Sequence, residues 1–171
     1  VLRKVDLAGY TTTVAGTGAQ GSADNVIGVW AQLDSPHGVF VDANDYIFVL
    51  ERDTNQIRLV APDGVVTTLL TTGASTLNYP SVGIALNAAG DVFVADYSNH
   101  KVRAFQVAAP SVPAWPGGAP TAEAALPVTG LCGTLGTADG DRTTARFTTP
   151  AGMTRDSIGE IGRASCREEC R

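Results

Sequence analysis

The sequence predicts an all-β fold, a partial β-propeller made of four-stranded antiparallel blades. Three observations lead to this prediction. A pattern recurs along the chain of 171 residues, several short apolar runs separated by turn formers fill each period, and nineteen glycines and nine prolines punctuate the runs. Four strands in a period of about 40–45 residues are typical of a propeller blade.

The repeat is visible when two segments are aligned. Residues 36–60, PHGVFVDANDYIFVLERDTNQIRLV, match residues 81–105, SVGIALNAAGDVFVADYSNHKVRAF, at an offset of 45. Apolar, acidic, turn and basic positions all agree between the two copies. Residues 1–15 match the back half of a further copy, with Arg3 at the place of Arg58, and residues 149–159 match the front of another. We therefore expect the chain to begin and end inside a repeat.

Each full copy contains four candidate strands. Period-2 apolar runs bounded by Gly, Asn, Asp and Pro indicate strands joined by hairpin turns. The first copy predicts Gly38–Asp42, Tyr46–Glu51, Gln56–Val60 and Val65–Leu70. The second predicts Val82–Asn87, Asp91–Asp96, Lys101–Gln106 and Val128–Cys132. A segment rich in Pro and Ala, residues 107–127, separates the last two of these, and its prolines favour an extended loop.

The second copy also carries a family resemblance. Its core, GDVFVADYSNHKVRAF, resembles an NHL repeat, and DYIFVLERDTNQIRLV in the first copy resembles a degenerate version of the same unit. The resemblance implies a propeller of about six blades. It divides residues 1–159 into the end of one blade (1–15), a blade (37–70), a blade with the insertion 107–127 (82–132) and the start of a next blade (149–159).

The positions that recur in each copy are expected to serve the blade rather than a ligand. An acid on the second strand and a base on the third can form an ion pair that fixes the turn between them. His100 in this turn is expected to act as a hydrogen-bonding element and not as a metal ligand. The structural signature comprises Glu51, Arg58, Asp96, Asn99, His100 and Arg103.

Function in a propeller resides on the loops at one face of the channel. The candidate loops are the connectors 15–35, 71–79 and 133–149, together with the turns 52–55 and 97–100. His37 is singled out because the second copy has no matching histidine. The candidate ligand-facing residues are Asp24, Trp30, His37, Arg52, Asp53, Tyr97, Asp139 and Arg142.

The composition excludes some partners and leaves others open. The formal net charge is −5 and the basic residues are scattered before the C-terminal segment, which argues against nucleic acid as a partner. No apolar window is long enough to cross a bilayer. Three cysteines do not make an even disulfide framework, so they indicate no compartment. Two histidines at non-equivalent places predict neither a metal site nor a cofactor.

Two functions compete. The first is a non-catalytic recognition or scaffold module that binds a protein, peptide or glycan through the loops of one face, as the resemblance to NHL propellers implies. The alternative is part of a propeller enzyme, similar to amidating lyases or lactonases, whose metal ligands would lie in further blades. Because such enzymes need several His or carboxylate ligands at the channel, the first function is favoured.

The C-terminal segment does not continue the repeat. After TRDSIG the pattern requires a strand such as DVFVAD, but residues 160–171 read EIGRASCREECR, without alternation and without an acid at the expected place. The stretch EIGRASCRE resembles the translation of a sequencing adapter. We therefore expect residues 160–171 to be a non-native tail and the native sequence to stop within a blade.

Overall fold

The computed structural model describes residues 1–70, 77–80, 82–87, 90–107, 122–125, 136, 144–155 and 161–166. These residues form β-strands and two short 3₁₀ helices, η1 (Gly28–Trp30) and η2 (Tyr97–Asn99), and none of them lies in an α-helix. Antiparallel pairing joins the strands into two four-stranded and two two-stranded sheets. The described part of the chain contains no helix that is long and apolar enough to cross a membrane.

The first blade follows the prediction closely. Its strands are β3 (Pro36–Val41), β4 (Ile47–Glu51), β5 (Gln56–Val60) and β6 (Val66–Leu70), paired in the order β3-β4-β5-β6. The β3–β4 turn is closed by Asp42, whose side chain accepts hydrogen bonds from the backbone N–H groups of Asn44 and Tyr46 at 2.9 and 2.8 Å. Such self-capped turns explain why a polar stretch between two apolar runs makes a tight hairpin.

The second blade differs from the prediction in its last strand. Its first three strands are β7 (Ile84–Leu86), β8 (Val92–Asp96) and β9 (Lys101–Val107), and the fourth is β10 (Ala122–Ala125). The prediction placed this strand at Val128–Cys132, whose residues lie outside the described ranges, and counted 122–125 as loop. Residues 122–125 lie between Pro120 and Pro127 and contain no proline, so each keeps a backbone N–H that is available for pairing.

Two shorter sheets flank the blades. At the N-terminal side, β1 (Leu2–Val5) pairs with β2 (Thr11–Ala15), which agrees with two outer strands of a blade. Arg3 on β1 is exposed, whereas its repeat equivalent Arg58 is fully buried. At the C-terminal side, β11 (Pro150–Arg155) pairs with β12 (Ile161–Cys166).

Strand β12 lies within the segment expected to be a foreign tail. Its pairing places Cys166 opposite Pro150, as Glu51 lies opposite Pro36 in the first blade. Every residue except proline has a backbone N–H and C=O that can pair in a sheet. The pairing of β12 with β11 is therefore compatible with either a native or a foreign origin of residues 160–171. The expected acid of the second strand is nevertheless replaced by a cysteine at this register position.

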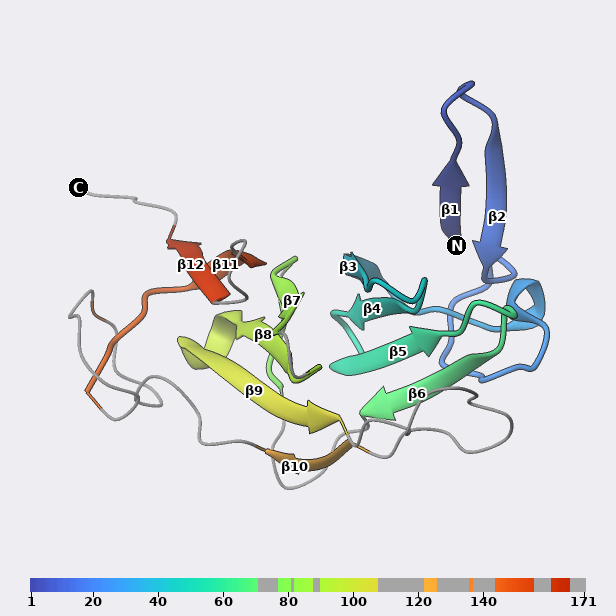
Figure 1. The fold of residues 1–171 in the computed structure, drawn as a ribbon. Helices are drawn as coiled ribbons and strands as arrows, with labels where there is room; N and C mark the ends of the chain where they lie inside the picture. The colour runs from blue at the N-terminus through green and yellow to red at the C-terminus, as the bar shows by residue number, and fades with distance from the viewer. Residues whose placement is uncertain are drawn as a thin grey trace.

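The blades pack face to face around a common inner edge. Figure 1 shows the first strands β3, β7 and β11 near one another, with the later strands of each blade lying successively further away. Gly38 on β3 and Gly83 on β7 permit this close approach. A Cβ at Gly38 would lie 2.8 Å from the carbonyl oxygen of Val82, and one at Gly83 would lie 2.7 Å from that of Ala151.

Alternating side chains of one strand fill two different cores. On β4, Phe48 and Leu50 point into a core shared with the second blade, where Ile84 and Val94 meet them. Val49, between them, points into a second core that the first blade shares with β2 and the connector 16–35. The period of two therefore places each middle blade between two apolar interfaces, which is how a propeller buries both faces of every sheet.

Candidate functional site

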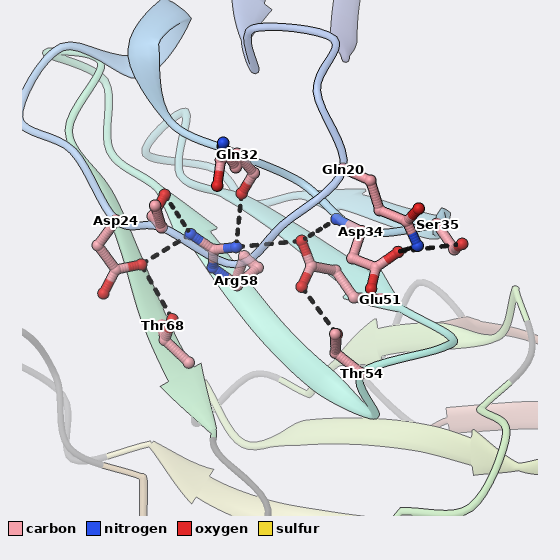
Figure 2. A network of polar contacts seen from close by, with 10 residues as sticks. Gln20, Asp24, Gln32, Asp34, Ser35, Glu51, Thr54, Arg58 and Thr68 are labelled. Carbon is pink, nitrogen blue, oxygen red and sulfur yellow. Dashed lines mark hydrogen bonds and ion pairs between the residues drawn. The ribbon is translucent and has the colours of Figure 1, made fainter.

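The first blade has a buried ion pair at its centre. Glu51 on β4 and Arg58 on β5 are both fully buried, and Arg58 Nη1 lies 3.1 Å from Glu51 Oε1. Arg58 also donates to the backbone carbonyls of Gln32 and Ala23 and to Asp24 Oδ1, the last at 2.7 Å. Figure 2 shows that these partners come from the connector before the blade. The arginine therefore fastens the connector to the sheet.

The carboxylate of Glu51 is held from several sides. It accepts hydrogen bonds from the backbone N–H of Asp34 at 2.9 Å and from the hydroxyl of Thr54 at 3.0 Å (Figure 2). Burial raises the pKa of Glu51 above its ordinary value of 4.5, and these donors together with Arg58 oppose the rise. Because nearly every donor is internal, this network joins β4 and β5 to the turn between them and to the connector before the blade.

The second blade repeats the arrangement with different residues. Asp96 on β8 pairs with Arg103 on β9, and both are buried. The backbone N–H of Asn78 donates to Asp96 Oδ1 at 2.8 Å, as Asp34 does to Glu51, and Asn99 Nδ2 donates to Oδ2 at 2.8 Å. The repeated acid thus joins the turn, the third strand and the connector in both blades.

Exposed side chains gather where the turns between second and third strands meet the connectors. Arg52 lies with its guanidinium carbon 4.6 Å from the centre of the Tyr79 ring, and its Nε lies 3.0 Å from Asp53 Oδ1. The rings of Tyr79 and Tyr97 are tilted, with their centres 6.5 Å apart. We call Arg52, Asp53, Tyr79 and Tyr97 the ridge. It runs from the first blade across to the second.

Asp53 is the acidic end of the ridge. The hydroxyl of Ser35 donates to its Oδ2 at 2.5 Å, and Arg52 donates to its Oδ1. These two hydrogen bonds, the one from Ser35 first, lower the pKa of Asp53 below its ordinary value of 3.8, and the nearby His37 adds to the effect. Asp53 is therefore a fixed anion beside the cation of Arg52.

His37 lies next to this end of the ridge. The β3–β4 register shifts between Pro36 and Gly38, so His37 sits in a bulge, and bulges commonly redirect a side chain. Its Nδ1 lies 2.9 Å from the carbonyl oxygen of Ser35, and because a carbonyl only accepts, Nδ1 carries the hydrogen. Ser35, His37 and Asp53 do not form a catalytic triad, since the serine hydroxyl donates to the aspartate rather than to the imidazole.

The structure brings together four of the eight predicted ligand-facing residues. His37, Arg52, Asp53 and Tyr97 lie at or beside the ridge. Asp24 instead binds Arg58 and the hydroxyl of Thr68 (Figure 2). Trp30 lies exposed on η1. Asp139 and Arg142 lie outside the described residues.

Sequence reasoning missed Tyr79 and Ser35. Both precede a proline and adopt positive φ, 52° and 46°, as Thr149 does at 42°. The signal was present in the sequence, because Ser-Pro, Tyr-Pro and Thr-Pro recur at the start of each copy. Two residues separate the proline from the glycine in the second copy (Pro80 and Gly83), but only one does so in the first (Pro36 and Gly38). At an offset of 45, which matches the glycines, Tyr79 therefore does not align with Ser35.

Two hollows in the described part of the surface lie away from the ridge. One of about 520 Å³ lies between the β1–β2 hairpin and the first blade, and Val39, Val41 and Ile47 line it on the blade side. Another of about 370 Å³ is lined by Asp24 to Val26 and by Val65 to Thr67. No ridge residue lines either hollow. Within the described residues, no group of three or more His, Cys, Asp or Glu side chains is placed to share a metal ion.

Comparisons with known proteins agree with this architecture. A crystal structure of a gluconolactonase-like protein aligns with a TM-score of 0.59 at 13% identity, covering 91% of this chain and 47% of that one. A virginiamycin B lyase from Staphylococcus aureus aligns with a TM-score of 0.45 at 13% identity, covering 74% of this chain and 33% of that one. No curated protein matches the sequence significantly.

The strand order and the first of these alignments define the chain as β-propeller in fold. Residues 77–105, which run from the connector into the second blade's third strand, match the family model of the NHL repeat. The chain therefore carries an NHL repeat, and it spans about half the length of the gluconolactonase-like structure.

Proposed function

We propose that the chain belongs to a non-catalytic recognition module that binds a protein, peptide or glycan through the ridge. The observation that carries the proposal is the row of Arg52, Tyr79 and Tyr97, which stand partly exposed across two neighbouring blades. Tyrosine and arginine are enriched among the residues that dominate binding energy. In a propeller of about six blades, further ridges of the same kind would extend the surface.

The ridge is pre-organised for binding. The backbone N–H of Tyr79 donates to Asn55 Oδ1 at 2.8 Å, and Arg52 is held by both Asp53 and the Tyr79 ring. Side chains that are already ordered lose less conformational entropy when a ligand binds. The ridge therefore offers aromatic and charged contacts at a low ordering cost.

The exposure of the ridge favours an extended ligand. Small molecules are usually held in concave pockets that enclose most of their surface, and the ridge residues line neither of the two hollows described above. Proteins, peptides and oligosaccharides can instead lie across a row of exposed aromatic rings. The ridge thus supports recognition of a chain-like or macromolecular partner.

A glycan array and a phage-displayed peptide library, each probed with the full chain, test the proposal. We expect a selected glycan or peptide to lose about tenfold or more in affinity for the Tyr79→Ala/Tyr97→Ala double variant. Tyr10→Ala is the matched control, because Tyr10 is an exposed tyrosine on the β1–β2 hairpin. Ligands that bind the double variant as tightly as the original chain would contradict the proposal.

A metal titration tests the non-catalytic proposal on the residues of this chain. A propeller enzyme of the amidating-lyase or lactonase kind needs a metal held by several His or carboxylate ligands. We expect calorimetric titration of the chain with zinc and with calcium to show no tight site. A stoichiometric tight site would overturn the non-catalytic assignment while leaving the fold unaffected.

A further inference from the structure

The turn between the second and third strands ends in a left-handed residue in both blades. Asn55 has φ 56° and His100 has φ 54°, and the two lie 45 positions apart. Asn and His are among the few residues other than glycine that enter this region with some frequency. The two positions are therefore structural equivalents that carry different side chains.

Both side chains bind the backbone of the segment that leads into the following blade. Asn55 Oδ1 accepts the N–H of Tyr79 at 2.8 Å, and His100 Nδ1 accepts the N–H of Thr149 at 3.2 Å. Tyr79 and Thr149 each precede the proline at the start of a copy. One hydrogen bond thus fastens each blade to the next at the same place, and we call it the clip.

We propose that the His100 clip is a pH-sensitive fastening that opens when His100 takes up a proton, whereas the Asn55 clip holds at any pH. A backbone N–H can only donate, so His100 Nδ1 must be unprotonated and the ring hydrogen must lie on Nε2. A protonated imidazole donates from both nitrogens and would meet the N–H of Thr149 with another N–H. The side-chain amide oxygen of Asn55 takes up no proton in the pH range where histidine titrates, so it can accept the N–H of Tyr79 throughout.

The charges on the elements that meet at His100 favour opening. On β8, η2 and β9 these are Asp96, Lys101 and Arg103, and Asp96 is already paired with Arg103. On the described segment 144–154 the charged residue is Arg146. Because Asp96, the one carboxylate of these described segments, is already engaged by Arg103, they offer a cationic His100 no free carboxylate as a counter-ion.

Amide hydrogen exchange read by NMR tests the clip residue by residue. Protection factors, corrected for the intrinsic effect of pH, are compared between pH 7.5 and pH 5, a range in which imidazoles commonly take up a proton. We expect the Thr149 amide to lose about 2- to 10-fold in protection at pH 5, the worth of one hydrogen bond. The Tyr79 amide should keep its protection. The Ala95 amide, which donates to the Gly83 carbonyl, reports any general loosening.

Two substitutions make the test more specific. His100→Asn copies the first blade's clip and should make Thr149 protection independent of pH, and Asn55→His should transfer the pH dependence to Tyr79. The ¹⁵N shifts of the His100 ring at pH 7.5 should show hydrogen on Nε2. Unchanged Thr149 protection between the two pH values, or hydrogen on Nδ1, would overturn the proposal.

Discussion

At the residue scale, the recurring acid and base hold the blades together. Arg58 is fully buried, and its two terminal nitrogens donate to Glu51, Asp24 and two backbone carbonyls. Removing one partner of a buried pair leaves an uncompensated charge, which costs far more than the pair itself contributes. The stability of the first blade should therefore depend on Arg58 more than on any exposed ion pair.

Arg58→Ala is predicted to lower the free energy of unfolding by about 3–5 kcal/mol, because Glu51 loses its buried counter-ion. Urea denaturation measures the change. Arg52→Ala is the control, since its pair with Asp53 is partly exposed and should cost less than about 1 kcal/mol. Equal effects of the two substitutions would show that the buried network does not stabilise the blade.

The lowered pKa of Asp53 leads to a prediction about how stability depends on pH. Its folded-state pKa lies below the ordinary value of 3.8 because Ser35 and Arg52 donate to it. The stability that it contributes is present above that ordinary value and is lost as the pH falls through the lowered pKa. Ser35→Ala should raise the pKa of Asp53 in an NMR titration, and Ser98→Ala should not. A pKa unmoved by Ser35→Ala would refute the role of that hydrogen bond.

At the element scale, strand periodicity decides most of the fold. Alternation along β4 sends Phe48 and Leu50 to one interface and Val49 to the other, and turn formers such as Asp42 bound the strands. These signals are local, so the sequence predicts the first blade and three strands of the second. The position of β10 depends instead on which extended segment reaches the edge of β9, a long-range choice that propensity does not encode.

The candidate site was predictable only in part, for a similar reason. Repeat comparison predicts that Arg52, Asp53 and Tyr97 lie on the turns between the second and third strands, and the structure has them between β4 and β5 and between β8 and β9. Tyr79 comes from a connector, where no strand period fixes its direction. Its position depends on the left-handed backbone before Pro80 and on the hydrogen bond to Asn55, which only the folded structure reveals.

The close approach of β7 and β11 at Gly83 leads to a prediction about stability. In Gly83→Ala the new Cβ would lie 2.7 Å from the Ala151 carbonyl oxygen and 2.9 Å from the Ala95 Cβ. Neither neighbour is the end of a flexible side chain, so we expect a loss of about 1–3 kcal/mol in the free energy of unfolding. Val39→Ala, at an exposed position of the neighbouring inner strand, is the control. A neutral Gly83→Ala would show that β7 and β11 are not in close contact.

At the scale of the whole molecule, the chain exposes surface that a blade normally buries. Val39 and Val41 are 54% and 52% exposed, and they line the hollow beside the β1–β2 hairpin. An open apolar face next to strand edges promotes association between copies. We therefore expect the isolated chain to be marginally stable or to self-associate.

Size-exclusion chromatography with light scattering, combined with a thermal melt, checks this expectation. Val39→Lys/Val41→Lys should reduce association, because charge on the exposed face opposes packing against it. A concentration-independent monomer with a cooperative melt above ~90 °C would contradict the expectation.

The central claim is that the ridge is the binding face of this propeller. Hydrogen exchange of the chain with and without a selected glycan or peptide tests it most directly. Bound ligand should slow exchange at residues 52–55, 77–80 and 97–100, where the ridge and its supporting turns lie. Slowed exchange confined to the η1 region or to the hollow beside the β1–β2 hairpin, with the ridge unchanged, would contradict it.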